Sequence, residues 1–413
     1  MQESTVSKKN QLWNINFKDF LWMFFLFLFL TNFMRVGIYL PLILIPYIFI
    51  YLINNRFGKF FWITLFSLLA FSLTYSYIAI SYEYVTIGLV LIYITYPVLL
   101  FILGYKIIHT NSYKKMVQYT LFIVVTMTFF GFLSVVKTLI LYGSMEAASI
   151  HFVGRYAVDL WSNEPISATV INLRFSLGLA LLPILFLAKD KYTPYVKSIK
   201  LISLVCFIAS FYSIILLGNR TGIAIAIISF LIVFIISRKI SLKKVSNLFV
   251  IVMSIILFAI LYNNNWLGLK ASWQASALSY RLQSNSSLED PRVNAWIESF
   301  LGMFTNPLGG KKSDIGLTYA HNLWLDVGYE TGILPFLLLI GFTIIPLTVL
   351  ITFLKKNHHV IFKGLFLAIF TAFFISFFLE PIIQAWFPYF TIFCFFIGII
   401  QKINLKTKEK KIL

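Results

Sequence analysis

Long apolar runs separated by short polar segments dominate the chain along most of its length. A helix that crosses the hydrocarbon core of a bilayer needs about 20 predominantly apolar residues. Twelve runs of about that length are found, at 18–34, 37–54, 60–80, 85–106, 118–141, 167–188, 198–217, 222–237, 246–263, 332–354, 359–379 and 382–401. The pattern predicts an all-α integral membrane protein, a single polytopic domain over residues 1–413 with about 12 transmembrane helices.

The composition agrees with this class of protein. The chain is 60% hydrophobic and 12% charged, with a mean hydropathy of +0.87, whereas a soluble domain is about 45–50% apolar and about 25% charged. A soluble globular enzyme, a disordered chain and a fibrous repeat are therefore excluded. The two cysteines, Cys206 and Cys394, lie inside apolar runs, which argues against a disulfide framework or a zinc site.

The positive charges predict the orientation of the chain. The net charge is +19, and lysine and arginine are enriched in cytoplasmic loops of membrane proteins. With a cytoplasmic N-terminus, the inner segments hold 24 of the 34 cationic residues, and each of these segments is basic. We expect both termini to be cytoplasmic, with residues 402–413 forming a solvated basic tail. The charge is then a topogenic and lipid-surface signal, and no nucleic-acid partner is expected.

The longest polar segment is the predicted extracytoplasmic loop at 264–331. Asp290 followed by Pro291 is a typical helix start, and apolar residues at helical spacing predict an amphipathic helix over 291–304. A second short helix is expected at about 321–331. Chemistry outside the cytoplasm would be located in this loop. The chain carries neither an H-E-x-x-H motif nor a Walker A loop, and no metal or nucleotide cofactor is expected.

Arg220 lies in the sequence Gly218-Asn219-Arg220-Thr221-Gly222, between two apolar runs at the predicted outer face. Thr221 could cap the following helix, and Gly222 would allow close backbone approach. A helix N-terminus presents free N–H groups and a partial positive charge, and the Arg220 guanidinium matches phosphate oxygens in two places. This combination is suited to a diphosphate. The simpler interpretation is a turn whose arginine binds lipid headgroups.

Three further arginines are candidates for binding an anion. Arg174 lies about seven residues, or about 10 Å, inside the sixth run, where a charge usually faces a polar cavity; snorkelling to the interface is the alternative. Arg292 begins the amphipathic loop helix and Arg281 precedes it by eleven residues. Either could face an anionic ligand or lie at a solvated helix end. Lys137 is closer to its helix end, so snorkelling is the better explanation for it.

His321 is the natural proton acceptor of the loop, because the unperturbed pKa of histidine is about 6.5. The alternative is an interfacial histidine that only caps the last loop helix, and His151 in the shorter outer loop is a weaker candidate. Asn322, Asp326 and Glu330 are spaced i, i+4, i+8 and share a helix face. Either acid could orient a base or bind a sugar hydroxyl, or the face could simply be solvated.

The order of three motifs resembles the bacterial O-antigen ligase and O-antigen or capsule polymerase family of membrane glycosyltransferases. Arg220-Thr221-Gly222 resembles the family's Ser-Arg-Thr-Gly motif, with Asn219 in place of serine. The second motif is Arg292-x-x-x-Trp296 followed by Asn306-Pro307-Leu308-Gly309-Gly310, with Lys311 and Lys312 replacing a further Gly-x-Gly. The third is His321-Asn322, then Gly328 and Thr331-Gly332-Ile333-Leu334. The likeness covers residues from about 200 to 335.

The resemblance implies an inverting glycosyltransferase of the bacterial cytoplasmic (inner) membrane, which needs neither metal nor nucleotide and whose active site faces the periplasm or cell exterior. The donor would be a glycan on undecaprenyl diphosphate, and the acceptor another glycan or lipid. Arg220 with Thr221 and Gly222, together with Arg174 and Arg292, would bind the diphosphate, and His321 would take the proton of the acceptor hydroxyl. A chain-length regulator and a flippase are candidate partners, besides membrane lipids.

Four interpretations remain open. A polymerase of lipid-linked repeat units into O-antigen or capsular polysaccharide is preferred, because no feature is assignable to recognition of lipid A core. A ligase that transfers the glycan to lipid A core would use the same motifs. A lipid-linked-oligosaccharide flippase would share the topology, but it predicts two related halves, which are not evident. A non-catalytic envelope scaffold is the last alternative, and a polar outer loop with intramembrane arginine argues against it.

Overall fold

The computed structural model describes residues 12, 15–108, 113–187, 195–236, 264, 291–356 and 358–409. These residues are almost entirely helical, with one two-stranded sheet. The chain divides into two compact units. The first unit comprises Met1–Thr126, Glu289–His358 and Phe373–Leu413, and the second comprises Met127–Leu288 and His359–Ala372.

Eight helices of the described residues are long and apolar enough to cross a membrane. They are α5 (Lys59–Ser81), α6 (Ile87–Ile107), α7 (Tyr113–Tyr142), α9 with the 3₁₀ turn η3 (Ala168–Leu185), α10 (Val196–Leu217), α17 (Ile333–Lys355), α18 (Val360–Leu379) and α19 (Ile382–Glu409). Each matches an apolar run of the sequence. The protein is therefore a multi-pass, all-α membrane protein, whereas the expected number of 12 spans stays a prediction.

Two of the predicted runs form shorter helices than expected, and the run at 222–237 has about its expected length. The run at 18–34 is α2 (Phe17–Leu30), whose 14 residues would extend only about 21 Å; the left-handed backbone of Asn32 prevents its continuation. The run at 37–54 is divided into η2 (Gly37–Tyr39), α3 (Leu40–Ile43) and α4 (Ile45–Ile53), and both α-helices start around a proline. The run at 222–237 is α11 (Arg220–Ile236), 17 residues long. The run at 246–263 lies outside the described residues.

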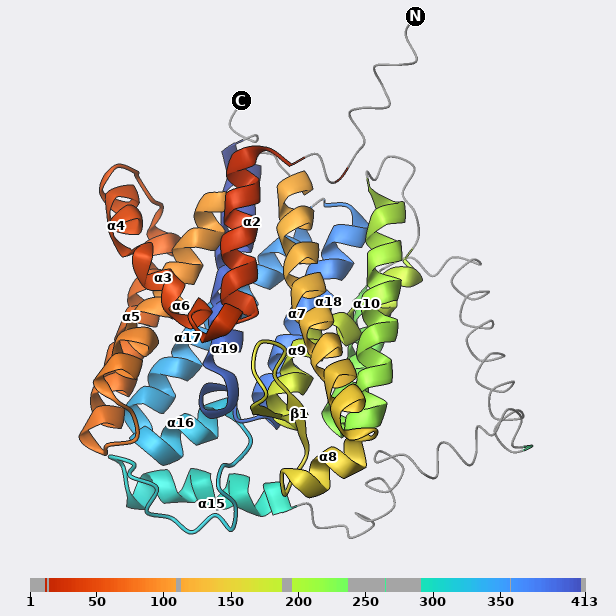
Figure 1. Cartoon of the computed structure of the whole chain (residues 1–413). Coiled ribbons are helices and arrows are strands. Elements are labelled where there is room, and N and C mark those ends of the chain that lie inside the picture. The colour runs from red at the N-terminus through yellow and green to blue at the C-terminus, as the bar shows by residue number, and fades with distance from the viewer. Residues whose placement is uncertain are drawn as a thin grey trace, which may run out of the picture. The chain divides into compact units, whose positions relative to one another are not determined.

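The first unit is centred on α6 and α19, which pack against each other and against α5 and α17 (Figure 1). Glycines allow this close approach. A Cβ added to Gly104 would lie 2.0 Å from the Phe395 carbonyl oxygen, and one added to Gly398 would lie 2.1 Å from that of Phe101. Small residues at such positions let membrane helices meet backbone to backbone. Helix α19 is kinked at Trp386 and continues to Glu409, so the expected tail at 402–413 begins as helix.

The first unit also contains the two predicted loop helices. Helix α15 (Pro291–Thr305) confirms the amphipathic helix expected at 291–304, and α16 (Leu323–Thr331) lies within the one expected at 321–331. Figure 1 shows α15 running crosswise to α5. Helix α16 packs on α15, α17 and α5, which brings the loop residues to the ends of the spans of this unit.

The second unit consists of the remainder of α7, α8 (Met145–His151), a β-hairpin, α9, α10, α11 and the start of α18. Strands β1 (Tyr156–Val158) and β2 (Pro165–Ser167) pair antiparallel; the sequence pattern did not predict this hairpin. Helix α9 is its central element, because all its residues from Ile171 to Ala180 are buried. A Cβ on Gly178 would lie 2.3 Å from the Ser210 hydroxyl of α10.

Candidate functional site

The loop that follows α15 is docked on the end of α16 by backbone hydrogen bonds. The N–H groups of Gly310 and Lys311 donate to the carbonyl oxygens of Glu330 (2.9 Å) and Tyr329 (3.1 Å). The last carbonyls of a helix have no partner within it, so this loop satisfies two of them. The docking brings Lys311 next to the end of α16.

Two glycines make the docking possible. Gly309 and Gly332 have positive φ angles of 79° and 89°, which are strained for other residues. A Cβ on Gly332 would lie 2.2 Å from the Pro307 carbonyl oxygen, and one on Gly309 would lie 2.5 Å from the Gly332 nitrogen. No side chain fits at either position without movement of the backbone.

The docked loop forms an ion pair between Lys311 and Glu330. The Lys311 ammonium lies 2.8 Å from Oε1 of Glu330, whose side chain is 5% exposed. The other carboxylate oxygen, Oε2, accepts hydrogen bonds from the Tyr75 hydroxyl of α5 (3.0 Å) and from the Gln384 amide of α19 (2.7 Å). Burial is the largest single influence and lowers the pKa of Lys311, but the charge of Glu330, its hydrogen bond and the nearby tyrosines together outweigh burial, so the pKa is raised. Glu330 therefore joins three elements that are far apart in the sequence.

Tyrosine rings surround the ammonium side of this ion pair. The Lys311 nitrogen lies 4.5 Å from the ring centroid of Tyr84 and 5.5 Å from that of Tyr319. The ring of Tyr82 stacks on Tyr84 at 5.6 Å. All three tyrosines are half-buried. Each ring has an apolar face and a hydroxyl group, and such rings next to a charged pair suit a polar ligand with an apolar face, such as a sugar ring.

Asp326 fixes the backbone on both sides of His321. Its Oδ1 accepts the N–H of Ala320 (2.7 Å) and its Oδ2 accepts that of Asn322 (3.1 Å). His321 itself has a φ of 57°, a conformation that is uncommon for a residue other than glycine. Burial, and then the nearby charge of Glu330, raise the pKa of Asp326 to about 8. Asp326 thus acts on the backbone that carries His321.

The structure corrects two of the interpretations left open for this part of α16, a solvated helix face and a cap formed by His321. Asn322, Asp326 and Glu330 are all buried, so they do not form a solvated face. Asn322, not His321, caps α16: its side-chain oxygen accepts the N–H groups of Trp324 and Leu325, each at 3.2 Å. His321 is half-buried, directly before the capping residue.

The Arg-x-x-x-Trp segment belongs to α15. The Trp296 indole donates to the Ala320 carbonyl oxygen (2.7 Å), which connects α15 to the residue before His321. Arg292 lies in the first turn of α15 and is half-buried. Arg281 lies outside the described residues. Trp296 therefore anchors the loop, a role that the motif alone did not indicate.

Arg220 is the first residue of α11 in the second unit. The expected cap is corrected: Asn219 rather than Thr221 caps the helix, because its side-chain oxygen accepts the Thr221 N–H at 3.0 Å. Gly222 has the expected role in close packing, since an added Cβ would lie 3.0 Å from methyl groups of Ile214 and Leu179. Arg220 is half-buried and Thr221 is buried. The side chain of Arg220 therefore extends from the first turn of a helix that Asn219 caps.

Arg174 lies in the interior of the second unit. It is 4% exposed, and its guanidinium carbon lies 4.2 Å from the ring centroid of Phe130. Asp159, in the turn of the β-hairpin, is close enough to interact with it electrostatically. Burial argues against snorkelling as the explanation of Arg174.

Lys137 holds the same hairpin turn. Its ammonium donates to the carbonyl oxygens of Asp159 (2.8 Å) and Ser162 (2.7 Å), so it binds protein groups rather than simply extending along its helix toward the interface. Arg155, before β1, donates to the carbonyl oxygens of Leu217 and Gly218 at the end of α10. The signal that could have identified this turn is the acid Asp159 between two predicted spans that each carry a cation.

The predicted site residues therefore form two groups. His321, Asn322, Asp326, Glu330 and Arg292 belong to the first unit, and Arg174, Arg220, Thr221 and Gly222 to the second. That Arg220 and His321 act in the same reaction stays a prediction. Lys311, Tyr75 and Gln384 were missed; a polar side chain inside an apolar run was the only signal for the last two. Within the described ranges, no cluster of three or more His, Cys, Asp or Glu could hold a metal ion.

No protein-family model matches the chain, and no curated protein matches it.

Proposed function

We propose that this membrane protein is a glycosyltransferase that moves a glycan from undecaprenyl diphosphate to an acceptor hydroxyl at the outer face of the bacterial cytoplasmic membrane. The observation that carries the proposal is the acid–base set of α16 and its docked loop. His321 is fixed by Asp326 through backbone bonds, and Glu330 is paired with Lys311. Buried ionisable groups of this kind are expensive in a membrane protein and mark functional sites.

In the proposed reaction, the acceptor oxygen attacks the anomeric carbon of the donor sugar and forms the new glycosidic bond. The bond between that carbon and the diphosphate oxygen breaks, and the diphosphate takes the electron pair. His321 takes the proton of the acceptor hydroxyl as general base. The anomeric configuration is inverted by this single displacement.

Fixed cationic groups would stabilise the negative charge that develops on the diphosphate. Arg220 at the first turn of α11 combines a guanidinium with the partial positive charge of the helix start. Arg174 and Arg292 would contribute further charge. The burial of Arg174 supports this role, because a cation in a low-dielectric setting acts more strongly on an anion than one in water.

The Lys311–Glu330 pair and the tyrosines around it would bind the glycan. Glu330 and Lys311 supply a hydrogen-bond acceptor and a donor for sugar hydroxyls, and Tyr84 and Tyr319 supply apolar faces for a sugar ring. A polymerase that extends lipid-linked repeat units is the preferred form of the activity. The ligase that uses lipid A core as acceptor is the second form.

Purified full-length variants test this proposal. His321→Ala should lower the rate of glycan transfer by about 10²–10⁴, the usual effect of losing a general base, and Arg220→Ala should do so by about 10²–10³. His151→Ala is the matched control, because His151 is an exposed histidine at the end of α8, and it should keep the wild-type rate. Folded His321→Ala and Arg220→Ala proteins with wild-type rates would refute the proposal.

A further inference from the structure

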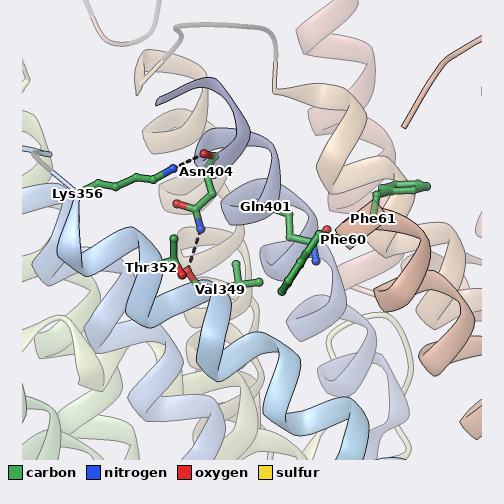
Figure 2. Close-up of a pocket in the computed structure, with 7 residues that line it drawn as sticks. All are labelled: Phe60, Phe61, Val349, Thr352, Lys356, Gln401 and Asn404. Carbon is green, nitrogen blue, oxygen red and sulfur yellow. Dashed lines mark hydrogen bonds between the residues drawn. The ribbon is translucent and has the colours of Figure 1, made fainter. Parts of the chain in front are cut away.

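A cavity opens between α5, α17 and α19 of the first unit, away from the loop residues described above. Its volume is about 190 Å³. It is lined by Phe60, Phe61, Val349, Thr352, Lys356, Gln401 and Asn404 (Figure 2). Binding sites for drug-sized molecules usually have about 300–1,000 Å³. This cavity therefore holds part of a molecule, such as the upper segment of a lipid, rather than a whole one.

The lining is apolar on one side and polar on the other. Phe60 is 49% exposed and Val349 is 4% exposed, so an aromatic ring borders the opening and an aliphatic side chain lies within. On the polar side, the Lys356 ammonium donates to the Asn404 carbonyl oxygen, and the Asn404 amide donates to that of Val349 at 2.8 Å (Figure 2). This division fits the boundary between the headgroup and the acyl chains of a lipid.

The charge around the cavity is positive. None of the seven lining residues is acidic, and Lys356 is among them. Lys59, Lys355 and Lys402 are the chain neighbours of lining residues on the three helices. The predicted orientation places all four lysines on the cytoplasmic side, where anionic lipids are concentrated and basic pockets between membrane helices bind their headgroups.

We propose that this cavity binds an anionic phospholipid of the cytoplasmic leaflet. The lipid phosphate would interact with Lys356 next to Asn404, and the upper part of an acyl chain would pack on Phe60 and Val349. The lipid would thereby connect the N-terminal end of α5 with the C-terminal parts of α17 and α19. This site is independent of the proposed transferase activity.

Lipid titration of the purified, delipidated full-length protein tests the proposal. Phosphatidylglycerol, phosphatidylcholine and inorganic phosphate are added separately, and bound lipid is followed by native mass spectrometry together with the melting temperature. Phosphatidylglycerol should bind and raise the melting temperature, whereas the other two should have little effect. Equal binding of phosphatidylcholine would overturn the anionic specificity, and equal stabilisation by inorganic phosphate would overturn the lipid as the ligand.

Two variants and one control locate the binding. Lys356→Gln should weaken phosphatidylglycerol binding about fivefold, which corresponds to about 1 kcal/mol for one lysine near a lipid surface. Lys355→Gln makes the same charge change at an exposed neighbour outside the lining, and it should bind as the wild type does. Thr352→Phe narrows the cavity from an exposed position and should also weaken binding.

Three outcomes would overturn the location. Equal weakening by Lys355→Gln and Lys356→Gln would indicate a general effect of surface charge. Unchanged binding in both Lys356→Gln and Thr352→Phe would exclude the cavity. Weaker binding in Lys356→Gln but unchanged binding in Thr352→Phe would show that the acyl chain does not occupy the cavity. That result would contradict the proposed packing of the chain on Phe60 and Val349.

Discussion

The ammonium of Lys311 lies 2.8 Å from the carboxylate of Glu330, although the two residues belong to a loop and to the helix that follows it. Lys311 also has a φ of 52°, a left-handed backbone conformation. A residue other than glycine in that region costs about 1 kcal/mol or more. The ion pair offsets this cost, which explains how a lysine is accommodated at this position of the loop.

Breaking this pair should destabilise the protein. Glu330→Gln would leave the Lys311 ammonium without its counter-charge, and Lys311→Met would leave a buried carboxylate. Removing one partner of a buried pair costs about 3–5 kcal/mol. The 30% exposure of Lys311 reduces the expected loss of unfolding free energy to about 2 kcal/mol. The double variant should recover part of that loss, as measured by unfolding in detergent. A double variant less stable than both single variants would contradict the pairing.

The pKa of Asp326 predicts a pH dependence of stability. Because the folded-state pKa is raised to about 8 from an ordinary value of about 3.9, the folded protein holds a proton that the unfolded chain releases between these pH values. The contribution of Asp326 to the free energy of unfolding should therefore be complete below about pH 4 and should be lost as the pH rises towards 8. Asp326→Asn should flatten this part of the profile, measured as melting temperature against pH. An unchanged slope would exclude Asp326 as its source.

Two glycines, Gly332 beside the docked loop and Gly341 in α17, predict opposite effects of the same substitution. Gly332→Ala should destabilise the protein by about 2 kcal/mol or more, because φ is positive and the new Cβ meets the Pro307 carbonyl oxygen. Gly341→Ala is the control: Gly341 is in α17 with nothing within 4 Å of an added Cβ. It should be neutral or stabilise by up to about 1 kcal/mol. Equal melting temperatures for both variants would contradict the described contact.

The buried guanidinium of Arg174 predicts a catalytic effect that lysine cannot replace. Arg174→Lys keeps the charge but loses the planar fork, so transfer rates should fall by about 10²–10³, as after loss of a donor that stabilises charge in the transition state. The measurement is kcat and KM for the lipid-linked donor with folded protein. A wild-type kcat/KM would mean that Arg174 has a structural role only.

The elements that the sequence predicted well are those whose signal is local. Helix α15 agrees with the prediction to within one residue, because Asp290-Pro291 marks its start and Asn306-Pro307 its end. Most long runs also gave helices, since 20 apolar residues leave few other structures. The prediction of one long helix was wrong for two runs, because the left-handed backbone of Asn32 ends the first and Pro41 helps to divide the second.

The missed features depend on long-range contacts or on a choice between two nearby residues of the same type of function. Tyr75 is 255 positions from Glu330, and no periodicity connects them. Asn219 and Thr221 are both good capping residues, so the sequence alone could not decide between them. The β-hairpin has only three residues a strand, too few for an alternating pattern to stand out.

Transfer of glycan from a purified lipid-linked repeat unit is the most direct test of the proposed activity. The full-length protein, reconstituted in vesicles, is incubated with undecaprenyl-diphosphate-linked oligosaccharide, and new glycosidic bonds are followed together with release of undecaprenyl diphosphate. We expect longer glycans or transfer to an added acceptor, with one carrier released per bond, and neither product with His321→Ala. Movement of the lipid-linked glycan across the vesicle membrane without any new glycosidic bond would contradict it and would identify a flippase.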